Sequence, residues 1–216
     1  MSGAQPFGQS YFERTYRNYE QQNPPRKMKF YRDLVAEATR AVSKPRVLDV
    51  GCAFGTFLSH LDTSWDLYGI DVSDYAVSKA RENLPHAHLA CSSAMDIPFQ
   101  ESFDVITAFD VIEHLPDLDR TAASISSKLA LNGSFIFAVP VYDGPLGPIV
   151  RALDHDATHV HKESREFWLT WARRHFGVED WQGILRYLLP GGVYVHWPTR
   201  VARRWTPAIV VSARCA

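Results

Sequence analysis

A short apolar run that ends in a glycine turn, at residues 45–56, constrains the fold of this chain more than any other stretch. The apolar side chains within residues 47–50 are typical of a strand that is buried on both faces of a parallel sheet. Gly51 and Gly55 interrupt the run, and residues 56–61 then have helical character. A strand, a glycine turn and a helix in succession form the first half of a nucleotide-binding unit, so we expect a ligand at this turn.

The spacing of the glycines distinguishes two classes of cofactor. A dinucleotide fingerprint needs glycine at the first, third and sixth positions, and only the first of these, Gly51, is glycine here. Small residues stand instead at the first, third and fifth positions, Gly51, Ala53 and Gly55, after the carboxylate of Asp49. Residues 47–55 thus resemble the first motif of the class I S-adenosylmethionine-dependent methyltransferases, with alanine in place of the middle glycine.

This resemblance implies an α/β fold, with a Rossmann-like, doubly wound sheet of seven mostly parallel strands, an antiparallel last strand and helices on both faces. The chain itself alternates strand and helix patterns, which calls for a parallel sheet with right-handed crossovers. We expect residues 1–44 to form an N-terminal arm and helix that could act as a lid. Residues 45–216 would form the methyltransferase domain, with a substrate-side insertion at about residues 140–162.

Composition and charge limit the classes of partner. A chain of 216 residues, 46% of them apolar, suits one folded domain. Its 23 basic and 24 acidic residues give no broad positive field, so we expect no nucleic-acid partner. Three distant cysteines, and the lack of a signal-peptide or membrane-spanning pattern, predict a cytoplasmic protein.

A carboxylate follows the second predicted strand, residues 67–70. Asp71 stands at the tip of this strand, where a carboxylate can accept two hydrogen bonds from a ribose diol. The alternative is a turn aspartate at the start of the next helix, for which Ser73 is the expected N-cap. Because Asp71 falls where the resembled family binds the ribose, we favour the functional interpretation.

Residues 92–99 resemble the loop that lies beside the adenine in this family. Many relatives have an acidic residue where this chain has Ser93, so either Ser93 or Asp96 could accept from the adenine amino group. Ala94 would offer its backbone N–H. Met95 would supply apolar surface for the purine, although it could equally be a core residue.

The fourth predicted strand, residues 103–109, continues into a Glu-His pair that resembles the fourth motif of the family. Ligands of open α/β sheets lie beyond the carboxyl ends of the strands, which places Phe109 and Asp110 beside the methionine part of the cofactor. His114 would contact the cofactor or substrate, or its imidazole would be satisfied by nearby backbone groups. Taken together, the motifs imply a cofactor site composed of Asp49, Gly51, Cys52, Ala53, Gly55, Asp71, Val72, Ser93, Ala94, Met95, Phe109, Asp110 and His114.

The region of residues 140–162 lacks a regular pattern, which is typical of a lid or a binding loop. It contains His155, His159 and His161, but no cysteine joins them and no familiar zinc spacing appears, so we expect no metal site. We interpret them as solvated or substrate-facing residues. His159, in a segment that resembles the substrate side of the family, is the first candidate for a catalytic base, and His114 is the second.

The two ends of the chain leave alternatives open. The tyrosine-rich residues 1–28 could form a flap over the cofactor or a fraying surface segment. Strands are predicted at residues 177–184 and 208–213, which the family would join in a hairpin. The aromatic and basic residues 187–205 could be ordinary hairpin packing, an anion site for the substrate or a patch that faces a membrane surface.

The resemblance implies transfer of a methyl group from S-adenosylmethionine to an acceptor by in-line displacement, with S-adenosylhomocysteine as the product. The protein would mainly position the two reactants and exclude water. Near-neutral charge and an irregular loop favour a small-molecule acceptor, although a lipid or protein acceptor stays open. The alternatives are a non-catalytic cofactor-binding protein and, against the glycine pattern, an NAD-dependent oxidoreductase.

Overall fold

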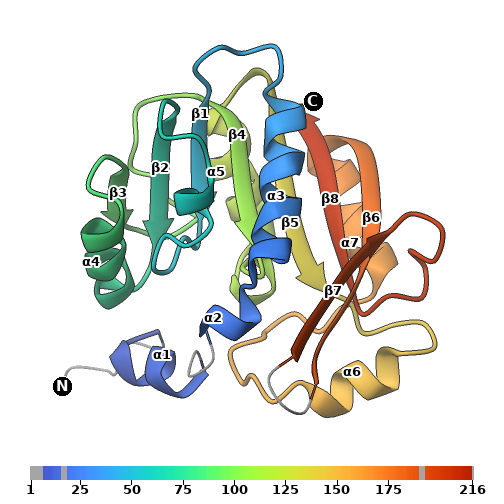
Figure 1. Cartoon of the computed structure of the whole chain (residues 1–216). Coiled ribbons are helices and arrows are strands. Elements are labelled where there is room, and N and C mark those ends of the chain that lie inside the picture. Colours follow the sequence, from blue (N-terminus) through green and yellow to red (C-terminus); the bar gives the residue numbers. More distant parts are fainter. Residues whose placement is uncertain (1–6, 16–18, 190–192, 216) are drawn as a thin grey trace.

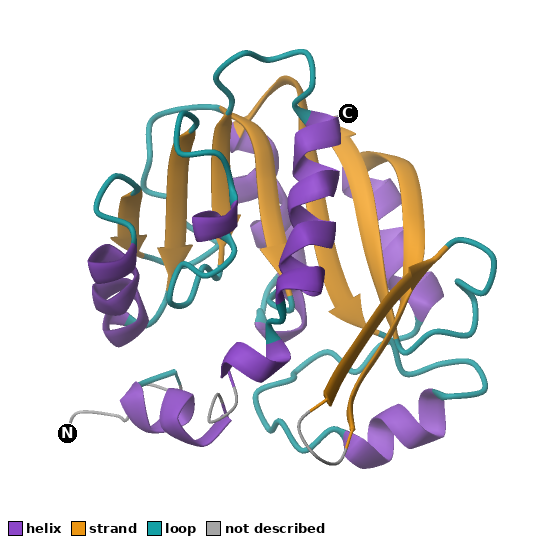
Figure 2. Ribbon diagram, in the orientation of Figure 1, coloured by secondary structure: helices purple, strands orange, loops and turns teal. Residues whose placement is uncertain are grey.

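The computed structural model describes residues 7–15, 19–189 and 193–215, which form one mixed sheet with helices on both faces (Figures 1 and 2). The described strands lie side by side in the order β3-β2-β1-β4-β5-β8-β6-β7. Their bounds are β1 Arg46–Val50, β2 Asp66–Asp71, β3 His88–Cys91, β4 Phe103–Phe109, β5 Leu129–Pro140, β6 Phe176–Leu189, β7 Val193–Thr199 and β8 Ala208–Cys215.

The sheet is parallel from β3 to β5, and its direction changes at β8, which runs antiparallel to both β5 and β6. The predicted fold class is confirmed, with eight strands among the described residues in place of the seven expected. The additional strand is β7, which forms an antiparallel hairpin with β6 and lies within the aromatic and basic stretch 187–205. Residues 190–192 of that stretch lie outside the described residues.

Helices cover the two faces of the sheet. In Figure 1, α3 crosses the front face, whereas α5 and α7 lie behind it and α4 flanks the edge at β3. The bounds of the helices and 3-10 turns are α1 Gln9–Thr15, α2 Tyr19–Gln22, α3 Pro25–Ala38, η1 Leu58–His60, α4 Asp74–Asn83, η2 Ile112–His114, α5 Leu118–Lys128, α6 Gly147–Leu153 and α7 Arg165–His175. The predicted N-cap of α4 is present, because the Ser73 hydroxyl accepts from the Ala76 N–H at 3.2 Å.

Two hydrophobic cores, one on each face, hold these layers together. Successive residues of a strand point to opposite faces. Val47 therefore packs under α3 with Tyr31, whereas Leu48 packs with Ile125 of α5 and Trp168 of α7. All five side chains are fully buried. This two-sided burial explains why the central strands are continuously apolar in sequence.

Three local predictions differ from the structure. Residues 56–61 form only the short turn η1. The helix that was expected to run to Asn132-Gly133 ends at Lys128, and Leu129 already belongs to β5, where it pairs with Phe103. Gly133 instead passes so close to β4 that a Cβ atom would lie 2.8 Å from the Phe103 carbonyl oxygen. The irregular insertion contains α6.

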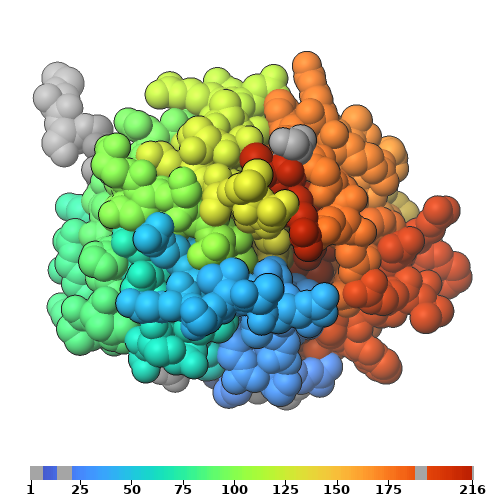
Figure 3. Space-filling view, turned by 90° about the horizontal axis from the view of Figure 1, so that it is seen from above, coloured from blue at the N-terminus to red at the C-terminus, as the bar shows by residue number. Residues whose placement is uncertain are grey.

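The carboxyl ends of the parallel strands meet at the lower edge of the sheet in Figure 1, where α1, α2 and α6 also lie. The chain order reverses between β1 and β4, and such a switch point opens a crevice beside the strand ends. Figure 3 views the opposite edge, where the end of β8, in red, lies beside the start of β5, in agreement with the pairing of Arg214 with Ser134. The fold therefore directs the ligand to the edge that carries α1 and α2.

The conformation of Gly55 gives a test of the fold. Its φ is +76°, and an added Cβ would lie 2.5 Å from Leu84 Cδ1. We expect Gly55→Ala to lower the free energy of unfolding by about 1–2 kcal/mol, because side chains disfavour the left-handed region. Urea unfolding measures this change. Gly177→Ala is the matched control, since the nearest atom to its Cβ, Arg214 O, would lie 3.9 Å away. An equal loss of unfolding free energy in both variants would contradict a special requirement for glycine at position 55.

Candidate active site

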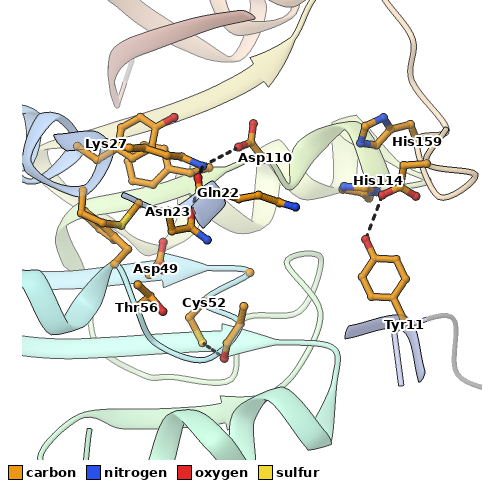
Figure 4. A pocket seen from close by; sticks show the side chains of 17 residues that line it. Tyr11, Gln22, Asn23, Lys27, Asp49, Cys52, Thr56, Asp110, His114 and His159 are labelled. Atoms are coloured by element: carbon orange, nitrogen blue, oxygen red, sulfur yellow. Dashed lines mark hydrogen bonds and ion pairs between the residues drawn. The ribbon is translucent and has the colours of Figure 1, made fainter. Parts of the chain in front are cut away.

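Two adjoining cavities, of about 190 and 210 Å³, open at the carboxyl edge of the sheet. The first extends toward α3 and is drawn in Figure 4, where Lys27 and Asn23 lie toward one end and His114 and His159 lie together at the other. The second extends along the ends of β2 and β3. Residues that line both cavities are Tyr11, Gly51, Ala53, Phe109, Asp110 and His114.

Asp71 connects the end of β2 to the glycine turn that follows β1. Its Oδ2 accepts from the Ala53 N–H at 3.0 Å, and its Oδ1 accepts from the Ser73 N–H at 2.9 Å. Burial raises the pKa of Asp71, and the backbone N–H groups of Ser73, Ala53 and Val72 oppose that rise. The carboxylate lines the second cavity, and its role in binding a ribose stays a prediction.

The turn itself depends on two residues in the left-handed region. Gly51 has a φ of +73°, and an added Cβ would lie 2.3 Å from Val111 Cγ2. Ala53, at the position of the family's middle glycine, has a φ of 46°. Its backbone N–H can therefore point to Asp71 while its small side chain remains at the cavity wall. Alanine at this position leaves room for a ligand.

The loop after β3 supplies another part of the second cavity. Ser93, Ala94 and Met95 line it together with Val72. The Ser93 hydroxyl accepts from the Met95 N–H at 3.2 Å, which shapes the loop. Asp96 is exposed and is not among the lining residues, so Ser93 is the better placed of the two predicted partners of an adenine amino group.

Asp110 lies at the junction of the two cavities and is held by cations from two distant elements. Its φ is 59°, it pairs with Arg186 of β6, and its Oδ2 lies 3.7 Å from Lys27 Nζ. Burial alone would raise the pKa of Asp110, but Arg186 and Lys27 outweigh burial and lower the pKa to about 2. The sequence predicted Asp110 at this place and missed both cations.

Two further carboxyl groups lie deep beside the cavities without such cations. Asp49 is 4% exposed, and burial raises its pKa to about 7, against the hydrogen bond from Thr107 Oγ1 at 2.7 Å. Glu113 is 1% exposed, and burial, reinforced by the negative charge of Asp110, raises its pKa well above the ordinary value. These two side chains are therefore less disposed to carry a negative charge than Asp110.

His114 and His159, the two predicted catalytic residues, lie together, with ring centroids 4.6 Å apart. His159 Nδ1 lies 2.9 Å from Asp154 Oδ2 and 3.1 Å from the Tyr142 hydroxyl. His114 Nδ1 lies 3.0 Å from Thr158 Oγ1. Burial, followed by the proximity of His159, lowers the pKa of His114. Both rings line the first cavity, so they can face a ligand there.

Three other sequence candidates lie elsewhere. His155 is exposed, and His161 donates from Nε2 to the Leu115 carbonyl at 2.9 Å, so the three loop histidines do not form one cluster. Gly55, predicted at the cofactor, is not a lining residue; it gives space to Leu84 instead. The remaining predicted cofactor residues, Asp49, Gly51, Cys52, Ala53, Asp71, Val72, Ser93, Ala94, Met95, Phe109, Asp110 and His114, all line one cavity or both.

The sequence left open whether the N-terminal arm forms a flap over the cofactor or a surface segment, and side chains of this arm contribute to the cavities. Tyr11 is 6% exposed and donates to Asp156 Oδ2 at 3.1 Å. Phe7 packs edge-on against His114, with centroids 5.9 Å apart. The arm therefore lies against the cavities, and its action as a lid stays a prediction. The side chains of Tyr16 and Tyr19, which the same prediction included, lie outside the described residues.

Comparison with known proteins places this geometry in a family. Residues 19–182, about three quarters of the chain, match the family described as "Methyltransferase domain". The chain belongs to this family. The prediction of a methyltransferase that uses S-adenosylmethionine is thereby confirmed at the level of the family. None of the helices that the structure describes is both long enough and apolar enough to cross a bilayer.

Individual relatives of this methyltransferase-family chain are distant. A ubiquinone biosynthesis O-methyltransferase of Nitrobacter winogradskyi is 29% identical over 47% of the chain and 45% of the relative, and the chain spans about half the length of the curated relatives it matches. A possible histamine N-methyltransferase of Thermotoga maritima matches in fold with a TM-score of 0.67, at 16% identity over 96% and 99% of the two chains. The N-methyltransferase NodS of Bradyrhizobium japonicum, crystallised with S-adenosylhomocysteine, gives a TM-score of 0.63 at 16% identity over 91% and 90%.

The ion pairs of Asp110 predict a pH-dependent stability. Its folded pKa lies below the unfolded value, so the charged carboxylate stabilises the fold above about pH 4 and loses this effect as the pH falls to about 2. We expect Asp110→Asn to cost about 2 kcal/mol near neutral pH and progressively less on acidification. Asparagine tolerates the left-handed region, so the backbone adds little.

Urea unfolding at several pH values measures this difference. Asp119→Asn is the control, because Asp119 is 66% exposed in its pair with His175. We expect its effect to stay below about 1 kcal/mol. A loss in Asp110→Asn that does not change with pH would contradict the role of the ion pairs.

Proposed function

We propose that the protein transfers the methyl group of S-adenosylmethionine to a small-molecule acceptor. The acceptor's lone pair forms the new bond to the methyl carbon while the carbon–sulfur bond breaks, and sulfur keeps that electron pair in S-adenosylhomocysteine. The observation that carries the proposal is Asp71, a carboxylate at the end of β2 that is tied to the left-handed turn after β1 and exposed to a cavity. In a chain of this family, that arrangement suits an adenosine.

The cofactor would lie across both cavities. Asp71 would accept from the ribose hydroxyls, and the loop of Ser93 and Met95 would flank the adenine. The amino-acid part would extend into the first cavity, where Lys27 offers a positive charge to a carboxylate and Asp110 a negative charge to an ammonium group. These opposite charges lie side by side in the cavity wall, as the two charged groups of a zwitterion do.

The acceptor would approach from the side of His159. This residue lines the first cavity and also a third cavity of about 180 Å³, whose wall includes Tyr142 and Arg186. Because Nδ1 of His159 is engaged by Asp154, its Nε2 is left to accept a proton from an acceptor group. His114 lies next to it and would contact the cofactor or the acceptor.

A small acceptor is favoured over a lipid surface. Trp197 and Trp205 are 63% and 68% exposed, as a membrane contact would require. However, two of the neighbouring cations are engaged within the protein, because Arg200 pairs with Asp180 and Arg203 stacks over Trp181. The three free cysteines are compatible with work in a reducing compartment such as the cytoplasm.

Substitution of Asp71 tests the cofactor site. We expect Asp71→Ala to weaken the affinity for S-adenosylhomocysteine by at least about tenfold, because two charge-assisted hydrogen bonds are lost. Isothermal titration calorimetry measures the affinity, with NAD as a second ligand that should not bind. Asp96→Ala is the matched control, since Asp96 is exposed on the same edge but does not line the cavity. Unchanged affinity in Asp71→Ala, or tight binding of NAD instead, would refute the site.

Substitution of His159 tests the catalytic assignment, once a screen with methyl-labelled cofactor has identified an acceptor. We expect His159→Ala to reduce turnover at saturating cofactor by about 10²–10⁴-fold, the range typical of a lost general base. The affinity for S-adenosylhomocysteine should change little. The control is His155→Ala, an exposed histidine of the same loop. Unchanged turnover in His159→Ala would remove the base assignment, whereas failure of every acceptor in the screen would favour a non-catalytic binding protein.

A further inference from the structure

We propose that Glu113, His114 and His159 form a binding site for one divalent transition-metal ion. Each of these residues offers a ligand atom, and the three atoms lie within 4.8 Å of one another. They come from two segments, η2 and the loop after α6, that the fold brings together at the wall of the first cavity. The site goes beyond the proposed methyl transfer and can be tested without it.

The hydrogen bonds around His114 determine which of its nitrogens is available. The Thr158 hydroxyl lies 2.5 Å from Asp156 Oδ1 and donates its single proton to that carboxylate. At His114, Thr158 Oγ1 must therefore act as the acceptor, 3.0 Å from Nδ1. The proton of the neutral imidazole is consequently on Nδ1, and Nε2 carries an uncommitted lone pair.

The same reasoning applies to His159. Asp154 Oδ2 lies 2.9 Å from His159 Nδ1 and already accepts from the Tyr142 hydroxyl at 2.5 Å and from Lys162 Nζ at 2.8 Å. A carboxylate that is surrounded by donors is charged, so Nδ1 of His159 donates to it. This leaves Nε2 of His159 as a lone-pair donor, and a carboxylate behind an imidazole is the arrangement that metal-binding histidines typically have.

Glu113 supplies the observation that points to a cation. The residue is only 1% exposed, and its buried Oε2 has no hydrogen-bond partner within the described residues. An unpartnered buried carboxyl oxygen is costly. Beside it stand the imidazoles of His114 and His159, whose Nε2 lone pairs are uncommitted. Binding of an ion would displace any proton that the Glu113 carboxyl group carries. A single positive ion would satisfy all three.

The ligand set indicates the class of ion. Two imidazole nitrogens and one carboxylate oxygen suit Zn²⁺ and similar divalent transition metals, whereas Mg²⁺ and Ca²⁺ prefer oxygen ligands. Ligands at about 2.0–2.2 Å from Zn²⁺ stand closer together than 4.8 Å, so small side-chain rotations would complete the site. Three protein ligands leave a coordination position open, and one of the ligands, His159, lines both the first and the third cavity, where the acceptor would approach.

The test measures metal binding to the full chain, free of affinity tags, after dialysis against a chelator. Calorimetry with Zn²⁺ and Mn²⁺, and visible absorption with Co²⁺, give the affinity and the coordination geometry. We expect one ion per chain and a cobalt spectrum with nitrogen ligation. Glu113→Gln and His159→Ala should each weaken binding by at least about tenfold, because each removes a direct ligand.

His155→Ala is the matched control and should bind as the unchanged protein does, because His155 is an exposed histidine of the same loop. Thermal unfolding of each metal-free variant verifies that it is folded. Absence of binding to the folded, unchanged protein would overturn the proposal. So would equal affinity in Glu113→Gln, His159→Ala and the unchanged protein. Titration with S-adenosylhomocysteine reports the cofactor site separately, so the two proposals can fail independently.

Discussion

The hydrogen bond from the Ala53 N–H to Asp71 is the contact on which the arrangement of the site depends. It joins the turn after β1 to the end of β2, and it requires the left-handed backbone that Gly51 and Ala53 adopt. The parallel pairing of β1 with β2 brings these two strand ends to the same edge, so the sheet and the site have one geometric cause. A carboxylate held in this way is already oriented before any ligand arrives, which reduces the entropy lost on binding.

Charge is distributed unevenly among the acidic groups at this edge. Asp110 has two cationic partners, Lys27 and Arg186, whereas Asp49 and Glu113 are buried with none at comparable distance among the described ion pairs. Burial without a partner disfavours the charged form of a carboxyl group, and a nearby cation restores it. A positively charged group of a ligand could therefore bind at Asp49 or Glu113. The ion pairs of Asp110, which hold β6 to the end of β4, would stay intact.

The sequence located side chains at this edge where a residue ends a strand or follows it directly, while their roles toward a ligand stay predictions. Asp71 and Asp110 were located because parallel strands end at one edge, so a local pattern fixes a position in space. Lys27, Arg186 and Tyr142 were missed because their role arises from packing between distant segments, and no local spacing records it. The same limit applies to Glu113 and His159, which meet only in the folded chain.

Glycine and histidine gave ambiguous signals for a different reason, since one residue type serves several physical purposes. Gly55 and Gly51 look alike in sequence, but Gly55 makes room for Leu84 and Gly51 shapes the cavity. Asn132-Gly133 has the composition of a helix end, and the structure uses it to bring β5 close to β4.

The histidines of residues 155–161 show the same ambiguity at the site itself. The His161 ring donates a hydrogen bond to a backbone carbonyl. His159 keeps one nitrogen free for a ligand, because Asp154 engages the other. A base and a metal ligand both need that free nitrogen, so the fold prepares His159 for either role, and occupancy by an ion decides between them. The chemistry of the edge is therefore set by the partners of the imidazole and not by the presence of histidine alone.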